Sequence, residues 1–161
     1  MIEAIVYRPM EPADASAVSR LILDSFNQFI AEEYSDEGRA EFTRYALPEA
    51  LVDRSRSKHF VLVAMAGERP VGVIELRAND HVSLLFVGAR FQRKGIAREL
   101  LMRALLVARP AKPSLDRVTV NSSRFGVPAY ERLGFRQTGP ERAVNGIVFI
   151  PMAHQLDPRP V

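Results

Sequence analysis

One stretch of the sequence, LLFVGARFQRKGIARELL at residues 84–101, decides the fold. Its first four residues are apolar, and the apolar residues after Gly95 recur at helical spacing, so the stretch predicts a strand, a turn and a helix. A helix start offers unpaired backbone N–H groups and the positive end of the helix dipole. Gly95 and Ala97 leave the approach to these groups open, and the cations within residues 93–98 favour an anion. The stretch therefore predicts a site for the phosphates of a small ligand.

The common phosphate loops do not account for this turn. The chain lacks both Gly-x-x-x-x-Gly-Lys-Ser/Thr and Gly-x-Gly-x-x-Gly, which excludes a Walker A loop and a dinucleotide fingerprint. No acidic residue lies between His81 and Arg98, so the local field is positive. The alternative at this point is that Gly95 is an ordinary turn residue and that the cations form a solvated rim.

The surrounding sequence predicts a mixed order of strands and helices. Before the turn we expect a strand at 4–8, a helix capped by Asp14 and reaching Ile30, one or two shorter helices within 32–56, and a meander of strands at 60–64, 71–76 and 81–87. After Gly95 we expect a helix ending before Pro110, a strand at 117–120, a short helix closed by Gly134, a strand from Phe135 and a last strand at 147–150.

Length and composition indicate one soluble domain. The 161 residues suffice for one core, and we expect a single domain over 1–156 with a short flexible tail at 157–161. The chain has no cysteine and only three scattered histidines, so no metal site is expected. No apolar run is long enough to cross a bilayer, and the first residues do not resemble a signal peptide, which predicts a cytoplasmic protein without a membrane partner.

Two segments together resemble the GNAT superfamily of acyl-CoA N-acyltransferases. The family signature, Gln/Arg-x-x-Gly-x-Gly/Ala after an apolar strand, stands here as Gln92-Arg93-Lys94-Gly95-Ile96-Ala97. The second segment is a strand ending in Asn121, followed by a helix with Tyr130 and then Gly134-Phe135. The departures are small: Ala97 fills the last small-residue position, and Ala129 stands where many members have an aromatic residue.

The resemblance implies an α/β (α+β) fold with acetyl-CoA as cofactor. The expected sheet is mixed, mostly antiparallel and twisted, with about seven strands flanked by helices and a splay between the fourth and fifth strands. Acetyl-CoA is expected to lie in this wedge and to leave as CoA. The residues that the resemblance assigns to the cofactor are Leu85, Phe86, Val87, Gln92, Arg93, Lys94, Gly95, Ile96, Ala97, Arg98, Asn121 and Tyr130.

The resemblance also implies catalytic roles. The Val87 N–H is expected to stabilise the oxyanion of a tetrahedral intermediate. Tyr130 is expected to protonate the departing thiolate, the alternative being a core tyrosine under Phe135. His81, placed six residues before Val87 and so expected on the same strand face, and Glu75 are the candidate bases, with water as a third possibility. Either side chain is equally interpretable as an ordinary strand residue.

Three functions remain open from the sequence. The first is an N-acetyltransferase that moves acetyl directly to a small-molecule or peptide amine within a ternary complex. The second is an acyl-CoA sensor of the same fold without transferase activity. The third, a nucleic-acid-associated protein, lacks support, because the net charge of +3 forms no basic stripe. The helices before residue 56, including Glu32 and Glu33, and the loop from Gly139 to Gly146 are expected to border the acceptor. The acceptor's identity and a homodimer stay open.

Overall fold

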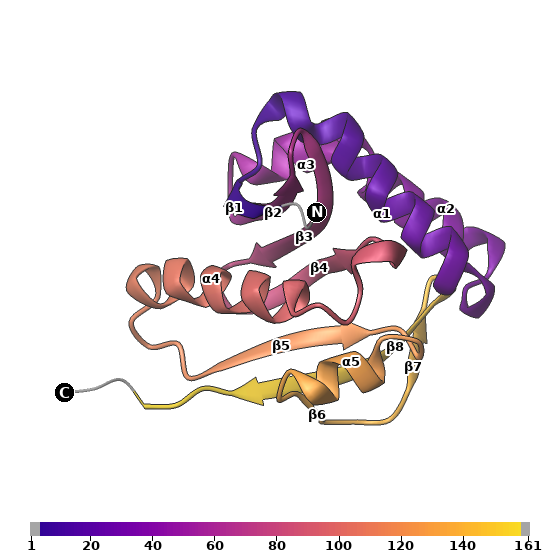
Figure 1. Cartoon of the computed structure of the whole chain (residues 1–161). Helices are drawn as coiled ribbons and strands as arrows, with labels where there is room; N and C mark the ends of the chain where they lie inside the picture. The colour runs from indigo at the N-terminus through magenta and orange to yellow at the C-terminus, as the bar shows by residue number, and fades with distance from the viewer. Residues whose placement is uncertain (1–3, 159–161) are drawn as a thin grey trace.

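The computed structural model describes residues 4–158, which fold as a central sheet covered by helices on both faces (Figure 1). Its helices are α1 (Ala15–Phe29), α2 (Asp36–Tyr45), α3 (Pro48–Ser55), α4 (Ile96–Ala111) and α5 (Val127–Arg132), with short 3-10 turns η1 (Pro12–Asp14), η2 (Ala31–Glu33) and η3 (Ala89–Phe91). The strands are β1 (Ile5–Pro9), β2 (His59–Ala66), β3 (Arg69–Arg77), β4 (His81–Val87), β5 (Arg117–Ser122), β6 (Arg136–Gln137), β7 (Arg142–Val144) and β8 (Ile147–Gln155). Of the tail predicted at 157–161, residues 159–161 lie outside the described chain.

The sheet has the predicted mixed, mostly antiparallel character. Its described strands run in the order β1-β2-β3-β4-β5-β8-β6, and β7 pairs with β8. Only the β4–β5 contact is parallel, and α4 makes the crossover between these two strands. The sheet has eight strands where about seven were expected. The added strand is β7, which forms a hairpin with β8 inside the segment expected to be a loop.

The predicted splay between the fourth and fifth strands is confirmed. β4 and β5 pair only through His81 with Thr119 and Val82 with Val120. Both strands run on beyond these pairs, β4 to Val87 and β5 to Ser122, so they separate toward their carboxyl ends, as Figure 1 shows. The sheet therefore consists of two arms, β1–β4 and β5–β8, joined at one end and open at the other.

Two apolar layers hold the helices on the sheet. One layer lies under α4 and includes Ile74, Leu100 and Phe135. The other lies under α1 and α3 and includes Val18, Ile22, Leu51 and Val73, with the predicted apolar stripe of α1 turned inward. Burial on both faces explains why β2 and β3 are apolar along almost their whole length.

Two details of the helices differ from expectation. Asp14 does not cap α1 through its side chain; its carboxylate instead accepts the Glu11 N–H at 2.8 Å and pairs with Arg8 at 2.7 Å. Helix α4 also continues through Pro110 to Ala111 rather than ending before the proline. Pro110 lies in the last turn, where only one helical hydrogen bond is lost, and the next bond, from the Lys112 N–H to the Ala108 carbonyl, still forms at 2.9 Å.

Candidate active site

The open end of the sheet leaves the backbone of β4 available on one side. The Gly88 N–H donates to the Val71 carbonyl at 2.9 Å, and Gly72 lies opposite Val87 in the antiparallel register. Because hydrogen-bonded pairs alternate along such a ladder, the N–H groups of Leu85 and Val87 point away from β3 and into the splay. Within the described chain, β5 pairs with β4 no further than Val82. The two N–H groups can therefore serve a ligand that lies along β4 as an additional strand.

The side chains at this end of β4 are apolar and incompletely covered. Leu85 and Val87 pack against the layer under α4, while Phe86 packs against the layer under α1 and α3, and all three are half-buried. A strand in the middle of a sheet is normally covered on both faces. The incomplete cover therefore marks a place that an apolar ligand segment fits.

The turn after β4 presents an uncapped helix start beside these N–H groups. Gly95 adopts φ +83°, and a Cβ added there would meet no heavy atom within 4 Å. The first helical bond runs from the Glu99 N–H to the Gly95 carbonyl at 3.0 Å, and no side chain caps the helix. Arg93 and Lys94 are exposed, so the residues present fit the pyrophosphate of a CoA-type ligand.

Two further side chains of the signature hold the turn in place. The Gln92 side-chain amide donates to the Val87 carbonyl at 3.1 Å, which ties the turn to the end of β4. Arg98 donates to the Arg132 carbonyl at 3.0 Å and so connects α4 with α5 across the splay. Ile96 is buried under the sheet, whereas Ala97 is half-buried near the helix start. Gln92 of the signature and Arg98 just after it thus position the turn and helix start that fit an anion.

Tyr130 is half-buried and packs against the core, and its hydroxyl is free. Its ring meets Phe135 edge to face at 5.3 Å between centroids, the packing that the structural alternative anticipated. Within residues 4–158 its hydroxyl has no hydrogen-bond partner. Burial raises the pKa of Tyr130 well above its ordinary value of 10.0, so the phenol remains protonated at neutral pH. Packing and proton donation are therefore compatible in this residue.

The structure does not bring His81 to Val87. A β-bulge at Ser83 shifts the register, because Glu75 lies opposite Leu84 whereas Leu76 lies opposite Val82. The prediction that His81 and Val87 share a strand face is therefore wrong: one extra residue turns the strand over. His81 and Val87 are also six residue steps apart, which span about 20 Å at ordinary strand spacing.

His81 is half-buried at the joined end of the two arms. Its Nδ1 lies 2.8 Å from the Thr119 hydroxyl. Burial, helped by the positive charge of Arg77, lowers the pKa of His81 to about 4. The imidazole is therefore neutral at physiological pH and lies away from the splay.

Glu75 is enclosed by partners. The side chain is fully buried, and its carboxylate accepts hydrogen bonds from the Tyr45 hydroxyl at 2.8 Å and the Ser83 hydroxyl at 2.5 Å. The Arg54 Nε lies 3.2 Å away, and the Arg54 guanidinium in turn covers the Tyr45 ring at 3.5 Å. This network joins α2 and α3 to the sheet, which gives Glu75 a structural role.

Asn121 lies at the far arm of the splay. It is exposed and faces away from the layer that contains Val118 and Val120. Its backbone pairs with Pro151 of β8. Its amide is thus free to contact a ligand in the wedge, although on the face opposite α4.

Glu33 makes a contact that the sequence did not reveal. Its carboxylate accepts the backbone N–H groups of Arg124 at 2.7 Å and Phe125 at 3.0 Å, in the loop between β5 and α5. The Phe125 ring stacks on Phe29 with 4.7 Å between centroids. These contacts join the two arms at the open end of the sheet. No local pattern signals them, because the partners are about ninety residues apart.

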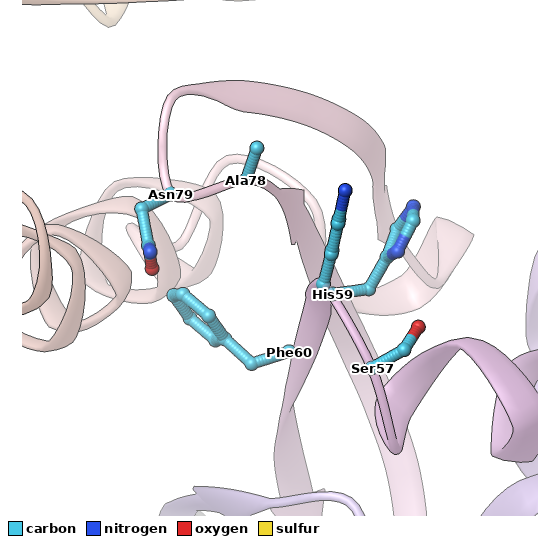
Figure 2. A pocket seen from close by; sticks show the side chains of 6 residues that line it. Ser57, His59, Phe60, Ala78 and Asn79 are labelled. Atoms are coloured by element: carbon cyan, nitrogen blue, oxygen red, sulfur yellow. The ribbon is translucent and has the colours of Figure 1, made fainter.

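Two shallow pockets lie at the joined end of the arms, away from the splay. Figure 2 shows the first, of about 230 Å³, lined by Ser57, His59, Phe60, Ala78 and Asn79, with the Phe60 side chain directed toward Asn79. The second, of about 420 Å³, surrounds His81 and Thr119. Neither contains Val87 or Gly95. The candidate site is therefore the backbone edge of β4 with the adjoining helix start.

Comparison with known proteins assigns the chain to a family of acyltransferases. The family model described as an acetyltransferase (GNAT) domain matches residues 30–156, and the chain belongs to this family. A curated relative is the uncharacterized N-acetyltransferase YafP of Escherichia coli strain K12, 25% identical over 138 residues, which cover 86% of this chain and 85% of that protein.

Solved structures share the fold. A GCN5-related N-acetyltransferase from Rhodopseudomonas palustris aligns with a TM-score of 0.77 at 21% identity, covering 97% of this chain and 99% of that one. The PaiA N-acetyltransferase from Thermoplasma acidophilum, solved in complex with coenzyme A, aligns with a TM-score of 0.77 at 21% identity, covering 95% and 99%.

Two further properties concern the described residues alone. Between residues 4 and 158, no three side chains of the His, Cys, Asp and Glu types gather as a metal site requires. Over the same range, no helix combines the length and apolarity needed to cross a membrane.

Proposed function

We propose that residues 1–156 form one N-acetyltransferase domain, which moves an acetyl group from acetyl-CoA to a primary amine by direct transfer in a ternary complex. One observation carries the proposal: the outward N–H groups of Leu85 and Val87 lie next to the uncapped start of α4. This arrangement offers donors for an amide-bearing arm and for a pyrophosphate within one continuous surface. The family membership of the chain supports the same reading.

Each part of this surface has a role in the proposal. Acetyl-CoA supplies an activated thioester. The backbone of residues 85–87 binds the arm that carries it, and the turn and helix start at residues 92–98 bind the pyrophosphate. The Val87 N–H donates to the carbonyl oxygen on which negative charge develops, an interaction worth about 3 kcal/mol in comparable acyl-transfer sites. Asn121 contacts the arm from β5.

Tyr130 donates the proton that the departing thiolate needs, and the proton that the attacking nitrogen loses as it becomes an amide returns through solvent to the phenolate, which restores Tyr130. The leaving thiol has a pKa of about 8.5, which is lower than the pKa of the Tyr130 phenol. The phenol therefore first donates a hydrogen bond to the departing sulfur and transfers its proton late in the reaction. The hydroxyl, without a partner among the described residues, supports this role, whereas the raised pKa keeps the phenol protonated but makes it a weaker acid toward the thiolate.

The observations favour loss of the acceptor's proton to water rather than to His81 or Glu75. His81 lies at the joined end of the arms with a pKa lowered to about 4. Glu75 is fully buried and held by Arg54, Tyr45 and Ser83, so an amine in the splay cannot contact its carboxylate. Solvent at the open end is the remaining proton acceptor.

Charge supports a cationic acceptor. Asp24, Glu32, Asp36 and Glu37 are exposed on the segment that follows the middle of α1. An amine that is mostly protonated in solution is attracted to such a segment. A small-molecule amine and a peptide amine both meet this requirement.

Free-thiol release from acetyl-CoA tests the proposal. With a panel of small and peptide amines, release is expected to require both the protein and an amine, and to reach a turnover of at least about 1 per second for a good acceptor. An acyl-CoA sensor of the same fold would bind CoA but release no thiol with any amine. That result would reject the transferase proposal.

The pH dependence tests the assignment of the base. At low amine concentration the rate is expected to rise about tenfold per pH unit between about pH 6 and pH 9, because the free-amine fraction grows in this way below a pKa of about 10.4. His81→Ala is expected to follow the same curve, since the His81 pKa of about 4 lies below this range. An inflection near pH 6.5 that disappears in His81→Ala would return the role to His81.

A further inference from the structure

A contact between the acceptor side and the cofactor side of the splay extends the proposed mechanism. Glu33 follows α1, which packs on β3 and β4, whereas its hydrogen-bond donors, the N–H groups of Arg124 and Phe125, follow β5. Glu33 therefore holds one arm of the sheet to the other at their open end. We call the contacts of Phe29 and Glu33 with residues 124–125 the strap.

The loop that the strap holds, residues 123–126, leads directly into the first turn of α5. The Gly126 N–H donates to the Ser123 hydroxyl at 3.0 Å, and the Gly126 carbonyl accepts the Tyr130 N–H at 3.0 Å. A Cβ added to Gly126 would lie 3.3 Å from Cε2 of the Tyr130 ring, so the loop also touches that ring closely. A displacement of residues 124–126 is therefore passed directly to Tyr130.

Helix α5 cannot fix its own orientation. It has only six residues, Val127–Arg132, and helices of this length are not stable by themselves. Its position depends on the packing of Val127, Tyr130 and Leu133 against the core and on the contacts at its two ends. The Arg98 bond to the Arg132 carbonyl holds the last turn, and the strap holds the residues before the first turn.

The chemistry of the strap suits this task. A carboxylate that accepts two successive backbone N–H groups makes short, charge-assisted bonds that fix the loop in direction as well as in distance. The Arg124 side chain is held in addition by Glu141, at 2.5 and 2.7 Å. The loop is thus fixed from both sides.

We propose that Glu33 is a positioning residue for Tyr130, acting through the loop between β5 and α5. The inference rests on the proposed function, since it says how Glu33, beside the proposed acceptor position, sets the position of the proton donor Tyr130. An acceptor that binds beside η2 meets the carboxylate that holds this loop. Acceptor binding and the placement of the Tyr130 hydroxyl are coupled in this way.

Glu33→Gln tests the inference, with Glu68→Gln as the control for the same change of charge. The amide keeps the size of the side chain but loses the charge, and it cannot accept both N–H groups with two oxygens. The turnover number is expected to fall about tenfold to a hundredfold, the scale of a misplaced catalytic group, while the KM for acetyl-CoA stays within about twofold. Glu68 is exposed in the turn between β2 and β3, and its substitution is expected to leave both constants unchanged.

The double variant separates positioning from general damage. If Glu33 acts through Tyr130, Glu33→Gln is expected to cause no further loss of turnover in a Tyr130→Phe background. Losses that multiply in the double variant would overturn the inference. So would a Glu33→Gln protein with wild-type turnover.

A measurement without any acceptor keeps the inference testable if no transferase activity is found. The Tyr130 phenol can be titrated by NMR in protein containing isotope-labelled tyrosine, with its signal assigned by its loss in Tyr130→Phe. Loosening the loop exposes the ring, so the Tyr130 pKa is expected to fall toward its ordinary value in Glu33→Gln and not in Glu68→Gln. An unchanged titration would reject the positioning role, whereas absent thiol release with a shifted titration would reject only the transferase proposal.

Discussion

Gly95→Glu is expected to abolish the rise in melting temperature that coenzyme A gives to the wild-type protein. A ligand that binds only the folded state at a hundredfold excess over its dissociation constant adds about 2.7 kcal/mol of stability, which amounts to several degrees for a chain of this size. The new carboxylate would stand in the open space beside the α4 start. It would both fill the phosphate position and repel the phosphates.

Gly67→Glu supplies the control for this experiment. Gly67 also has a positive φ, +62°, and also has open space where a Cβ would lie, so the substitution carries the same backbone strain. It lies in the turn between β2 and β3 rather than at the helix start. We expect it to lower the melting temperature while keeping the shift with coenzyme A. A full shift in Gly95→Glu would contradict the site itself.

Tyr130→Phe is expected to lower the turnover number by about tenfold to a thousandfold, the range over which one positioned acid acts. Affinity for coenzyme A should be nearly unchanged, because the ring and its contact with Phe135 remain. Since burial raises the Tyr130 pKa, the wild-type protein should show no loss of activity from ionisation of this phenol at moderately alkaline pH. Steady-state thiol release and thermal shifts with coenzyme A measure the two properties separately.

Tyr7→Phe is the matched control. Tyr7 lies on β1, away from the splay, where the Arg103 guanidinium covers its ring at 4.6 Å. Loss of its hydroxyl should leave turnover unchanged. If Tyr130→Phe also stayed within about twofold of the wild type, Tyr130 would have to be regarded as a packing residue, and the thiolate would leave without its help.

The parts of the fold that short segments encode were predicted well. The turn at residues 92–95 and the strand before it are specified by neighbouring residues, and the change from apolar strand to amphipathic helix at Gly95 locates the crossover. The meander of β2, β3 and β4 follows from apolar runs separated by tight turns, and its antiparallel pairing is confirmed. The splay was expected only from the family resemblance, because no local pattern shows where two strands separate.

Features that depend on distant residues were not predictable in the same way. The bulge at Ser83 arises between β3 and β4, and it overturned an inference about His81 that assumed regular alternation. The burial of Glu75 depends on Tyr45 and Arg54, which lie thirty and twenty-one residues earlier. The contacts of Glu33 depend on a loop in the other arm. In each case the partner is fixed by tertiary packing, which spacing along the chain does not contain.

The separation of β4 from β5 leaves backbone groups of β4 open to pairing with another molecule. Sheets are vulnerable at their outermost strands, where unpaired backbone groups can recruit a foreign strand, and proteins commonly guard such borders with charge or proline. Here the splay leaves a further strand edge unpaired inside the sheet, along Leu85–Val87. These residues include neither a charged residue nor a proline. The opening that we propose takes a ligand as an additional strand thus also presents backbone groups with which an extended peptide from another molecule can pair.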